Sequence, residues 1–154
     1  MKKLILNIQI SCSKKGWIPS KNIFLNWVKS DLIIIKKLSK ITIRIVDKEE
    51  SRILNFNFRG KNIPTNIISF PFEPPKNFKT IFIGDLIICK QLIYLESKKQ
   101  KKNLKSYWAH IFIHGLLHLL GYNHLIYKKA VDMQDLESKI MTNIGYSDPY
   151  LYNS

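Results

Sequence analysis

Acidic residues are scarce in this chain. Only 11 of its 154 residues are Asp or Glu, against 25 Lys and Arg, which leaves a formal net charge of +14. Such an excess attracts phosphate backbones and makes binding dependent on salt. Nearly all of the positive charge is lysine, however, and a chain rich in Lys, Ile and Asn can reflect a nucleotide bias. The charge therefore favours a nucleic-acid partner without establishing one.

Cysteines and long apolar runs are also few. Cys12 and Cys89 lie far apart and form no CxxC pattern, so neither a disulfide framework nor a sulfur-ligated metal is predicted. The longest apolar runs, Leu32–Ile35 and Ile111–Ile113, fall far short of the roughly 20 residues of a membrane helix. The basic start of the chain is interrupted by polar residues, and no small-residue cleavage site follows. We therefore expect a cytoplasmic protein with no membrane partner.

Turn residues and hydrophobic periodicity divide the chain into short strands and helices. We expect strands at 3–11, 41–46, 67–70 and 80–88, the last interrupted at Gly84 and Asp85, and helices at 20–38, 47–57, 89–98, 104–120 and 128–144. A chain with 45% hydrophobic residues can bury one core without disulfides. Because strands come early and helices late, the prediction is an α+β fold. Residues 1–154 form a single domain, with a small mixed β-sheet packed against helices.

The histidines are clustered. Three of the four fall within eleven residues, and the fourth, His110, stands one helical turn upstream. His114 and His118 are four residues apart, which places their Cβ atoms roughly 5–6 Å apart on one face of a helix. Gly121 offers the positive φ that ends helices, so the chain can turn and bring His124 back toward the pair. This pattern indicates a metal site.

Helix geometry limits which histidines can share an ion. His110 and His118 are separated by about 12 Å along a helix axis, whereas Zn–N bonds are about 2.0–2.1 Å long. The ligands are therefore either His110 with His114, or His114 with His118 and His124. Only the second set uses the glycine turn, and it leaves a coordination position open for water, as in catalytic zinc sites. We predict one zinc ion per chain on the second set, with His110 behind the ligands or facing the substrate.

The spacing H-x-x-x-H-x-x-G-x-x-H is that of metzincin peptidases, and it predicts a helix and turn reminiscent of zincins. Gly115 stands where the catalytic glutamate of those peptidases belongs. A peptidase needs that base beside the metal-bound water. The pattern therefore supports a metal and opposes a peptidase.

The chain closely resembles the YbeY family, bacterial metal-dependent endoribonucleases that act in rRNA maturation. The resemblance spans nearly the whole length, and the residues that carry it are His114–His124, Asn55, Arg59–Lys61, Pro64–Phe72, Gly84–Ile88, Met133 and Glu137. The chain departs from the family pattern at Asn123, where an acid usually precedes the last histidine, and at Asn66, where an acid is common.

The resemblance implies a zinc-dependent, single-strand-specific endoribonuclease that acts in 16S rRNA 3′-end maturation and late ribosome quality control. Its partners would be single-stranded RNA, rRNA and the small ribosomal subunit, with no DNA expected. Zinc would be held by His114, His118 and His124. A metal can supply a nucleophile from water or stabilise attack by the RNA 2′-hydroxyl, and the residues favour neither.

The remaining site residues follow from charge and position. Arg59 is one of only three arginines, and its planar guanidinium suits a phosphate. By themselves Arg59–Lys61 would be read as a turn with solvated charges, but the resemblance at these positions implies that Arg59 is catalytic and binds RNA together with Lys61. Asp85 is expected either to hold the second nitrogen of a ligand histidine or to cap the segment after it. Asn123 could accept one hydrogen bond near the metal without carrying charge.

Two residues are expected to be structural, and two alternative functions remain open. Met133 is expected to pack in the core, and Glu137 to pair with a lysine on its own helix. One alternative is a metallopeptidase of metzincin-like spacing that lacks the usual glutamate. The other is a non-catalytic ribosome-assembly factor with a structural zinc, which a fourth protein ligand would support.

Overall fold

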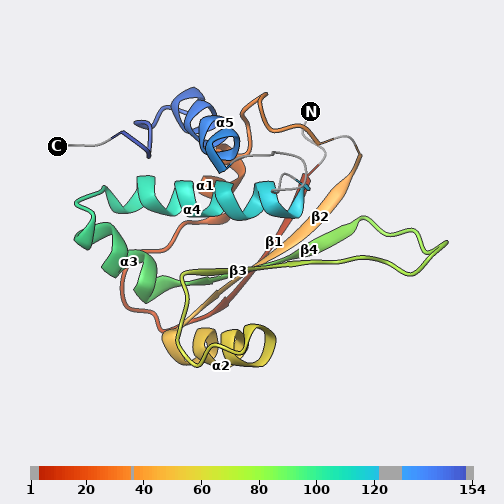
Figure 1. The fold of residues 1–154 in the computed structure, drawn as a ribbon, viewed down its shortest axis with the longest axis horizontal. Coiled ribbons are helices and arrows are strands. Elements are labelled where there is room, and N and C mark those ends of the chain that lie inside the picture. Colours follow the sequence, from red (N-terminus) through yellow and green to blue (C-terminus); the bar gives the residue numbers. More distant parts are fainter. Residues whose placement is uncertain (1–3, 36, 122–129, 152–154) are drawn as a thin grey trace.

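The structure is a computed structural model that describes residues 4–35, 37–121 and 130–151. Within these residues the chain forms a small α+β domain with a four-stranded mixed sheet and five helices, as the sequence predicts (Figure 1). The elements are β1 (Leu4–Ser11), α1 (Lys21–Trp27), β2 (Ser39–Val46), α2 (Lys48–Arg59), β3 (Ile67–Pro71), β4 (Phe82–Cys89), α3 (Lys90–Lys99), α4 (Leu104–Leu119) and α5 (Ala130–Asn143). None of the described helices is long and apolar enough to cross a membrane.

The sheet has the strand order β1-β2-β4-β3. Strands β1, β2 and β4 are parallel, and β3 pairs antiparallel with β4 at one edge. Helix α4 crosses one face of the sheet, with α1 and α5 on the same side, whereas α2 covers the opposite face (Figure 1). Helix α4 is therefore the central helix of the fold.

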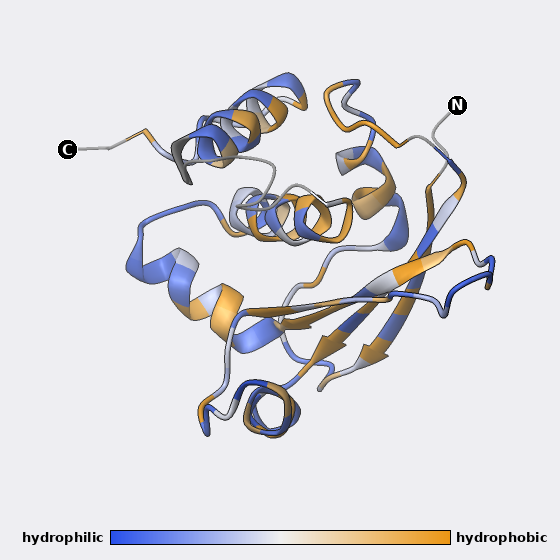
Figure 2. Cartoon of the chain, turned by 45° about the vertical axis from the view of Figure 1, so that its right-hand side comes forward, coloured by the Kyte–Doolittle hydropathy of each residue, from blue (hydrophilic) through white to orange (hydrophobic). Residues whose placement is uncertain are grey.

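The main core lies between α4 and the sheet, where Figure 2 shows hydrophobic residues on the strands and on the helix. Ile41, Ile43 and Ile45 of β2 alternate into this core and are fully buried. From the helical side, Phe24 of α1 makes an edge-to-face ring contact with Phe112 of α4, with centroids 5.0 Å apart. Helix α4 is buried on most of its circumference, so its histidines are the exception in an apolar environment.

A smaller core on the other face holds α2. It consists of Val46, Ile68, Ile87 and Cys89, with Leu54 of α2 packed against them. Burial raises the pKa of the Cys89 thiol, which stays in its protonated, apolar form. Both cysteines are free, as expected from their spacing.

The first helix is shorter than predicted. The expected helix over 20–38 is wrong, because α1 ends at Trp27. The hydroxyl of Ser30 accepts a hydrogen bond from the backbone N–H of Leu32 at 3.3 Å and donates to Asn143 at 2.7 Å. A serine side chain that bonds nearby backbone competes with helical hydrogen bonding. The apolar residues beyond this turn therefore belong to a loop.

Strand β4 runs without a break through Gly84 and Asp85, where the sequence predicts an interruption. Only the register changes there, because one extra β4 residue, Ile83, is inserted opposite the step Lys40–Ile41 of β2. Gly84 has a φ of +154°, and a Cβ on it would lie 2.4 Å from the carbonyl oxygen of Phe70. The glycine therefore serves the close approach of β3 rather than a break in the strand.

Replacing Gly84 by alanine is expected to lower the free energy of unfolding by about 2–4 kcal/mol, from backbone strain and the displaced β3 carbonyl. Urea unfolding measures the loss. Gly145→Ala is the matched control, since Gly145 also has a positive φ, +98°, but has nothing within 4 Å of its Cβ position. Equal losses in the two variants would contradict the role assigned to the β3 contact.

Candidate metal centre

Helix α4 presents its histidines while it packs closely on the sheet. Its first turn is capped by Asn103, whose side chain accepts a hydrogen bond from the N–H of Ser106 at 3.1 Å. Near its other end Gly115 faces β3 and β4, and a Cβ there would lie 2.5 Å from Ile67 Cδ1 and 3.0 Å from Leu86 Cδ2. A larger residue at 115 would push the helix away from the sheet. The position that carries the glutamate in zinc peptidases is thus a packing contact in this chain.

The centre of the site is Glu137 of α5. Its side chain is only 1% exposed, and its Oε1 atom lies 2.9 Å from Nδ1 of His114 and 3.1 Å from Nε2 of His110. The hydroxyl of Tyr150 donates to the same oxygen at 3.1 Å. One buried carboxylate oxygen therefore joins α4, α5 and the segment after α5.

This network determines which ring nitrogen of His114 faces the carboxylate as a donor. Burial alone would raise the pKa of Glu137, but the hydrogen bonds from His110 and His114 outweigh it, and the pKa falls to about 2. The carboxylate is thus ionised at neutral pH and can only accept hydrogen bonds. Nδ1 of His114 must carry the proton, and in the neutral ring Nε2 then has a free lone pair.

That lone pair points toward a second histidine. Nε2 of His118 lies 3.1 Å from Nε2 of His114, and the ring centroids are 4.6 Å apart. Two nitrogens bound at 2.0–2.1 Å to one tetrahedral zinc ion are about 3.3 Å apart, so the pair has nearly the spacing of two ligands. Such a pair is stable when the nitrogens share a proton or a cation. A carboxylate on the far nitrogen of a ligand histidine is also the usual support of protein zinc sites.

The predicted third ligand, His124, lies outside the described residues, as does Asn123. Within the described residues no cluster of three or more His, Cys, Asp or Glu side chains could hold a metal ion. The structure thus brings together two of the three predicted ligands, at nearly the nitrogen spacing of a zinc site.

His110 is buried, and it does not join the pair. Its Nε2 atom lies 3.1 Å from the Tyr150 hydroxyl as well as from Glu137, and its ring packs edge-to-face on the Tyr150 ring. Its other nitrogen, Nδ1, is buried with no hydrogen-bond partner among the described residues. His110 therefore reaches His114 only through Glu137.

The expected pairing of Glu137 with a lysine on its own helix is wrong, because the carboxylate instead bonds the two histidines of α4. The sequence held a signal for this arrangement. Glu137 falls in the stripe Met133, Ile140 and Met141, all of which are buried, so an acid at that position requires a buried partner. Met133 itself packs in the core, as predicted.

Asp85 lies in the middle of β4, and burial raises the pKa of its carboxyl group. It makes no side-chain hydrogen bond with any described residue, a histidine of α4 included. Its register partner is Phe70 of the edge strand β3. Its two expected roles, holding a ligand histidine or capping the next segment, remain predictions.

Arg59 and Lys61 lie on the other side of the sheet from the histidines. Arg59 is the last residue of α2, Gly60 ends that helix with a φ of +73°, and both charged side chains are exposed. Within the described residues the guanidinium of Arg59 has no partner. The helices nevertheless meet the same edge strand. The ring of Phe58 in α2 packs on Phe70 of β3 with centroids 4.9 Å apart, and α4 contacts β3 at Gly115.

Comparison with known proteins concerns the family and the fold of the chain. Residues 10–145 match the family model described as Endoribonuclease YbeY. The solution structure of TM1509 from Thermotoga maritima is similar to the chain, with a TM-score of 0.57 and 20% sequence identity. The match covers 94% of this chain and 99% of that one. At this level of identity the likeness concerns the fold.

Proposed function

Since this chain belongs to the YbeY family of endoribonucleases, we propose that it is a zinc-dependent endoribonuclease specific for single strands. We propose further that it acts in the cytoplasm, in 16S rRNA 3′-end maturation and late ribosome quality control on the small ribosomal subunit. The observation that carries the proposed zinc dependence is the His114–His118 pair, whose Nε2 atoms are 3.1 Å apart. The other ring nitrogen of His114 is hydrogen-bonded to the buried carboxylate of Glu137.

His114, His118 and His124 would hold one zinc ion in a zincin-like helix and turn. A zinc ion bound there lowers the pKa of its water and polarises a phosphoryl oxygen. Glu137 keeps the proton of His114 on Nδ1, so that the lone pair of Nε2 stays free to bind the zinc ion. His110 and Tyr150 hold Glu137 in place, and Asn123, which precedes His124 in the sequence, would supply an uncharged hydrogen-bond acceptor.

Arg59 would bind the phosphate of the RNA, and Lys61 would add a second positive charge. Because α2 and α4 flank the edge strand β3 from opposite faces (Figure 1), an RNA strand that crosses this edge can reach both sides of the sheet. Only an unpaired strand is narrow and flexible enough to follow such an edge. Asp85 is the register partner of Phe70 on the strand paired with β3, and its carboxylate would repel a phosphate at this edge unless it is protonated.

The packing of Gly115 argues against the peptidase alternative. A glutamate at 115 would meet Ile67 and Leu86 rather than a metal-bound water. Phosphodiester cleavage has no such requirement, because positive charge around the phosphoryl oxygens supplies much of the stabilisation of the transition state.

The proposal is tested by incubating zinc-loaded protein with an end-labelled single-stranded RNA, the same sequence as a duplex, and casein. The expected result is cleavage of the single strand, far slower cleavage of the duplex, and no peptide release. Loss of cleavage on chelation and its return with zinc complete the expected pattern. Zinc-loaded protein that binds RNA but leaves it intact would support an assembly factor instead, and casein cleavage would support the peptidase.

A further inference from the structure

A second candidate site lies at the opposite end of α4 from the histidine pair. A pocket of about 520 Å³ opens where the three parallel strands end, and we call it the strand-end pocket. The side chains that define it are Ser13, Lys15, Trp17, Lys48, Lys90 and Tyr94. Leu104, the first residue of α4, also lines it, and His114 is ten residues further on, or about 15 Å along the helix. The pocket is therefore separate from the metal centre.

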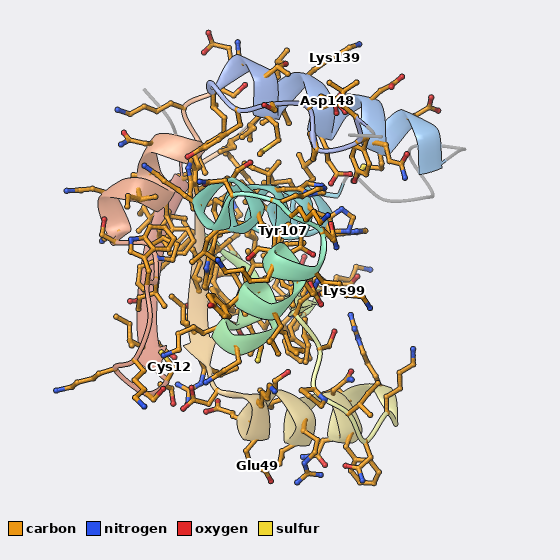
Figure 3. All side chains as sticks on the ribbon, turned by 90° about the vertical axis from the view of Figure 1, so that its left-hand side faces the viewer. Cys12, Glu49, Lys99, Tyr107, Lys139 and Asp148 are labelled. Atoms are coloured by element: carbon orange, nitrogen blue, oxygen red, sulfur yellow. The ribbon has the colours of Figure 1, made fainter. Side chains whose placement is uncertain are left out.

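The topology of the sheet creates this pocket. Ser11, Val46 and Cys89 are register partners at the carboxyl ends of β1, β2 and β4. The chain leaves β1 toward the face that carries α1, and it leaves β2 toward the opposite face, into α2 (Figure 1). Such a divergence at the carboxyl ends of parallel strands opens a crevice in which α/β proteins bind ligands. Cys12, just after β1, and Glu49, at the start of α2, mark this end of the molecule in Figure 3.

Hydrogen bonds hold the loop after β1 in place. The N–H of Ser13 donates to Asp47 at 2.9 Å, and the amide of Gln91 donates to the other carboxylate oxygen. Asp47 occupies the N-cap position of α2, but its side chain bonds these groups and makes no capping hydrogen bond. The ammonium group of Lys90 donates to the carbonyl oxygens of Ser13 and Lys15. The wall of the pocket is thus formed before any ligand binds.

The lining of the pocket is basic and aromatic. It includes Lys15, Lys48 and Lys90, and none of the described residues that line it is acidic. Lys90 is only 6% exposed, its ammonium group is held by the loop after β1, and it interacts electrostatically with the nearby Asp47 carboxylate. The positive potential of the cavity therefore comes mainly from Lys15 and Lys48. Trp17 and Tyr94 expose 39% and 49% of their surfaces. Exposed aromatic rings beside lysines are the usual means of binding single-stranded nucleic acid, by stacking on bases and pairing with phosphates.

We propose that the strand-end pocket holds one unpaired nucleotide of an RNA strand, with its base stacked on Trp17 and its phosphate beside Lys15 and Lys48. Tyr94 forms the second aromatic wall, and Lys90 holds the loop. This inference rests on the proposed function, because it takes RNA as the ligand. The pocket would anchor the strand away from the point of cleavage and so contribute affinity rather than chemistry.

Tryptophan fluorescence tests the proposal directly. Of the three tryptophans, Trp27 and Trp108 are 3% and 0% exposed, so quenching by a stacked base reports on Trp17. The full chain is titrated with a six-nucleotide uridine RNA in the presence of a chelator, which separates binding from cleavage. We expect saturable quenching in the unmodified protein. In Trp17→Phe the quenching is lost, while the anisotropy of a labelled RNA still shows binding.

A pair of charge reversals supplies the matched comparison. Lys15→Glu with Lys48→Glu is expected to weaken RNA binding at least about tenfold. It is also expected to reduce the slope of log K against log salt by about 0.7, the value for one phosphate contact on a single strand. Lys21→Glu with Lys29→Glu changes the net charge equally on exposed residues of α1 and the turn after it. It is expected to weaken binding less than about threefold, because it alters only the general field.

Three results would overturn the proposal: no quenching, equal weakening by both pairs, or uridine monophosphate that quenches at the same concentration as the RNA. The last would identify a free nucleotide as the ligand. Cleavage by zinc-loaded protein is scored separately. RNA that is cut without quenching refutes the pocket and leaves the nuclease assignment intact. Quenching without cleavage supports the pocket and refutes the nuclease.

Discussion

Alanine in place of Arg59 is expected to lower kcat/KM for cleavage of single-stranded RNA by about 10²–10³-fold, the usual cost of removing one group that stabilises a developing negative charge. The guanidinium is exposed at the end of α2 and has no partner among the described residues. Its donors are therefore available to a phosphate that crosses the β3 edge. Steady-state kinetics on a labelled RNA measure the effect.

Two variants give this prediction its control. Arg52→Ala removes another arginine of α2, but Arg52 is only partly exposed and is held by Glu49 at 2.5 Å, so its loss is expected to change kcat/KM less than about twofold. Arg59→Lys keeps the charge without the planar fork and is expected to recover only part of the activity. Equal effects of Arg52→Ala and Arg59→Ala would mean that Arg59 contributes only to the net charge.

Glutamine in place of Glu137 is expected to weaken zinc affinity and to lower RNA cleavage by about 10–100-fold, as for other carboxylates that support a ligand histidine. The amide has nearly the same shape but no charge, and it can donate to the Nδ1 atom of His114. The proton is then no longer held on Nδ1. It can move to Nε2, which then has no free lone pair with which to bind zinc. Competition with a chromophoric chelator measures the zinc affinity without reference to activity.

Glu96→Gln is the matched control for this change. Glu96 is another partly buried carboxylate, and it accepts hydrogen bonds from Tyr107 at 2.7 Å and from Asn66 at 2.9 Å. It touches no histidine of the described residues, so its replacement is expected to affect stability and leave zinc affinity unchanged. Similar zinc affinities in the two variants would show that Glu137 only stabilises the fold.

The sequence predicted the elements that carry strong local signals. The strands around Ile41–Val46 and Ile67–Phe70 and the helix of the histidines have clear periodicity or β-branched runs, and the structure places them within one or two residues. The helix expected over 20–38 ends early in the structure. Its end involves the hydrogen bond from Ser30 to Asn143, a tertiary contact that no local pattern in the sequence reveals.

The site was predictable only in part, because the sequence pattern reveals local spacing and not tertiary contacts. The spacing of His114 and His118 is a property of one helix, and it gave the pair directly. The partner of His114 is Glu137, 23 residues away on another helix, and no local pattern links the two. Position alone also did not reveal that Gly115 is a packing contact, or that Arg59 lies on the opposite face of the sheet.

The most direct test of the account is a combined measurement of zinc content and RNA cleavage in the unmodified protein and in His114→Ala. The account predicts close to one zinc ion per chain, cleavage that stops on chelation and returns with zinc, and neither zinc nor cleavage in the folded variant. Cleavage at an unchanged rate by chelated protein or by His114→Ala would contradict it.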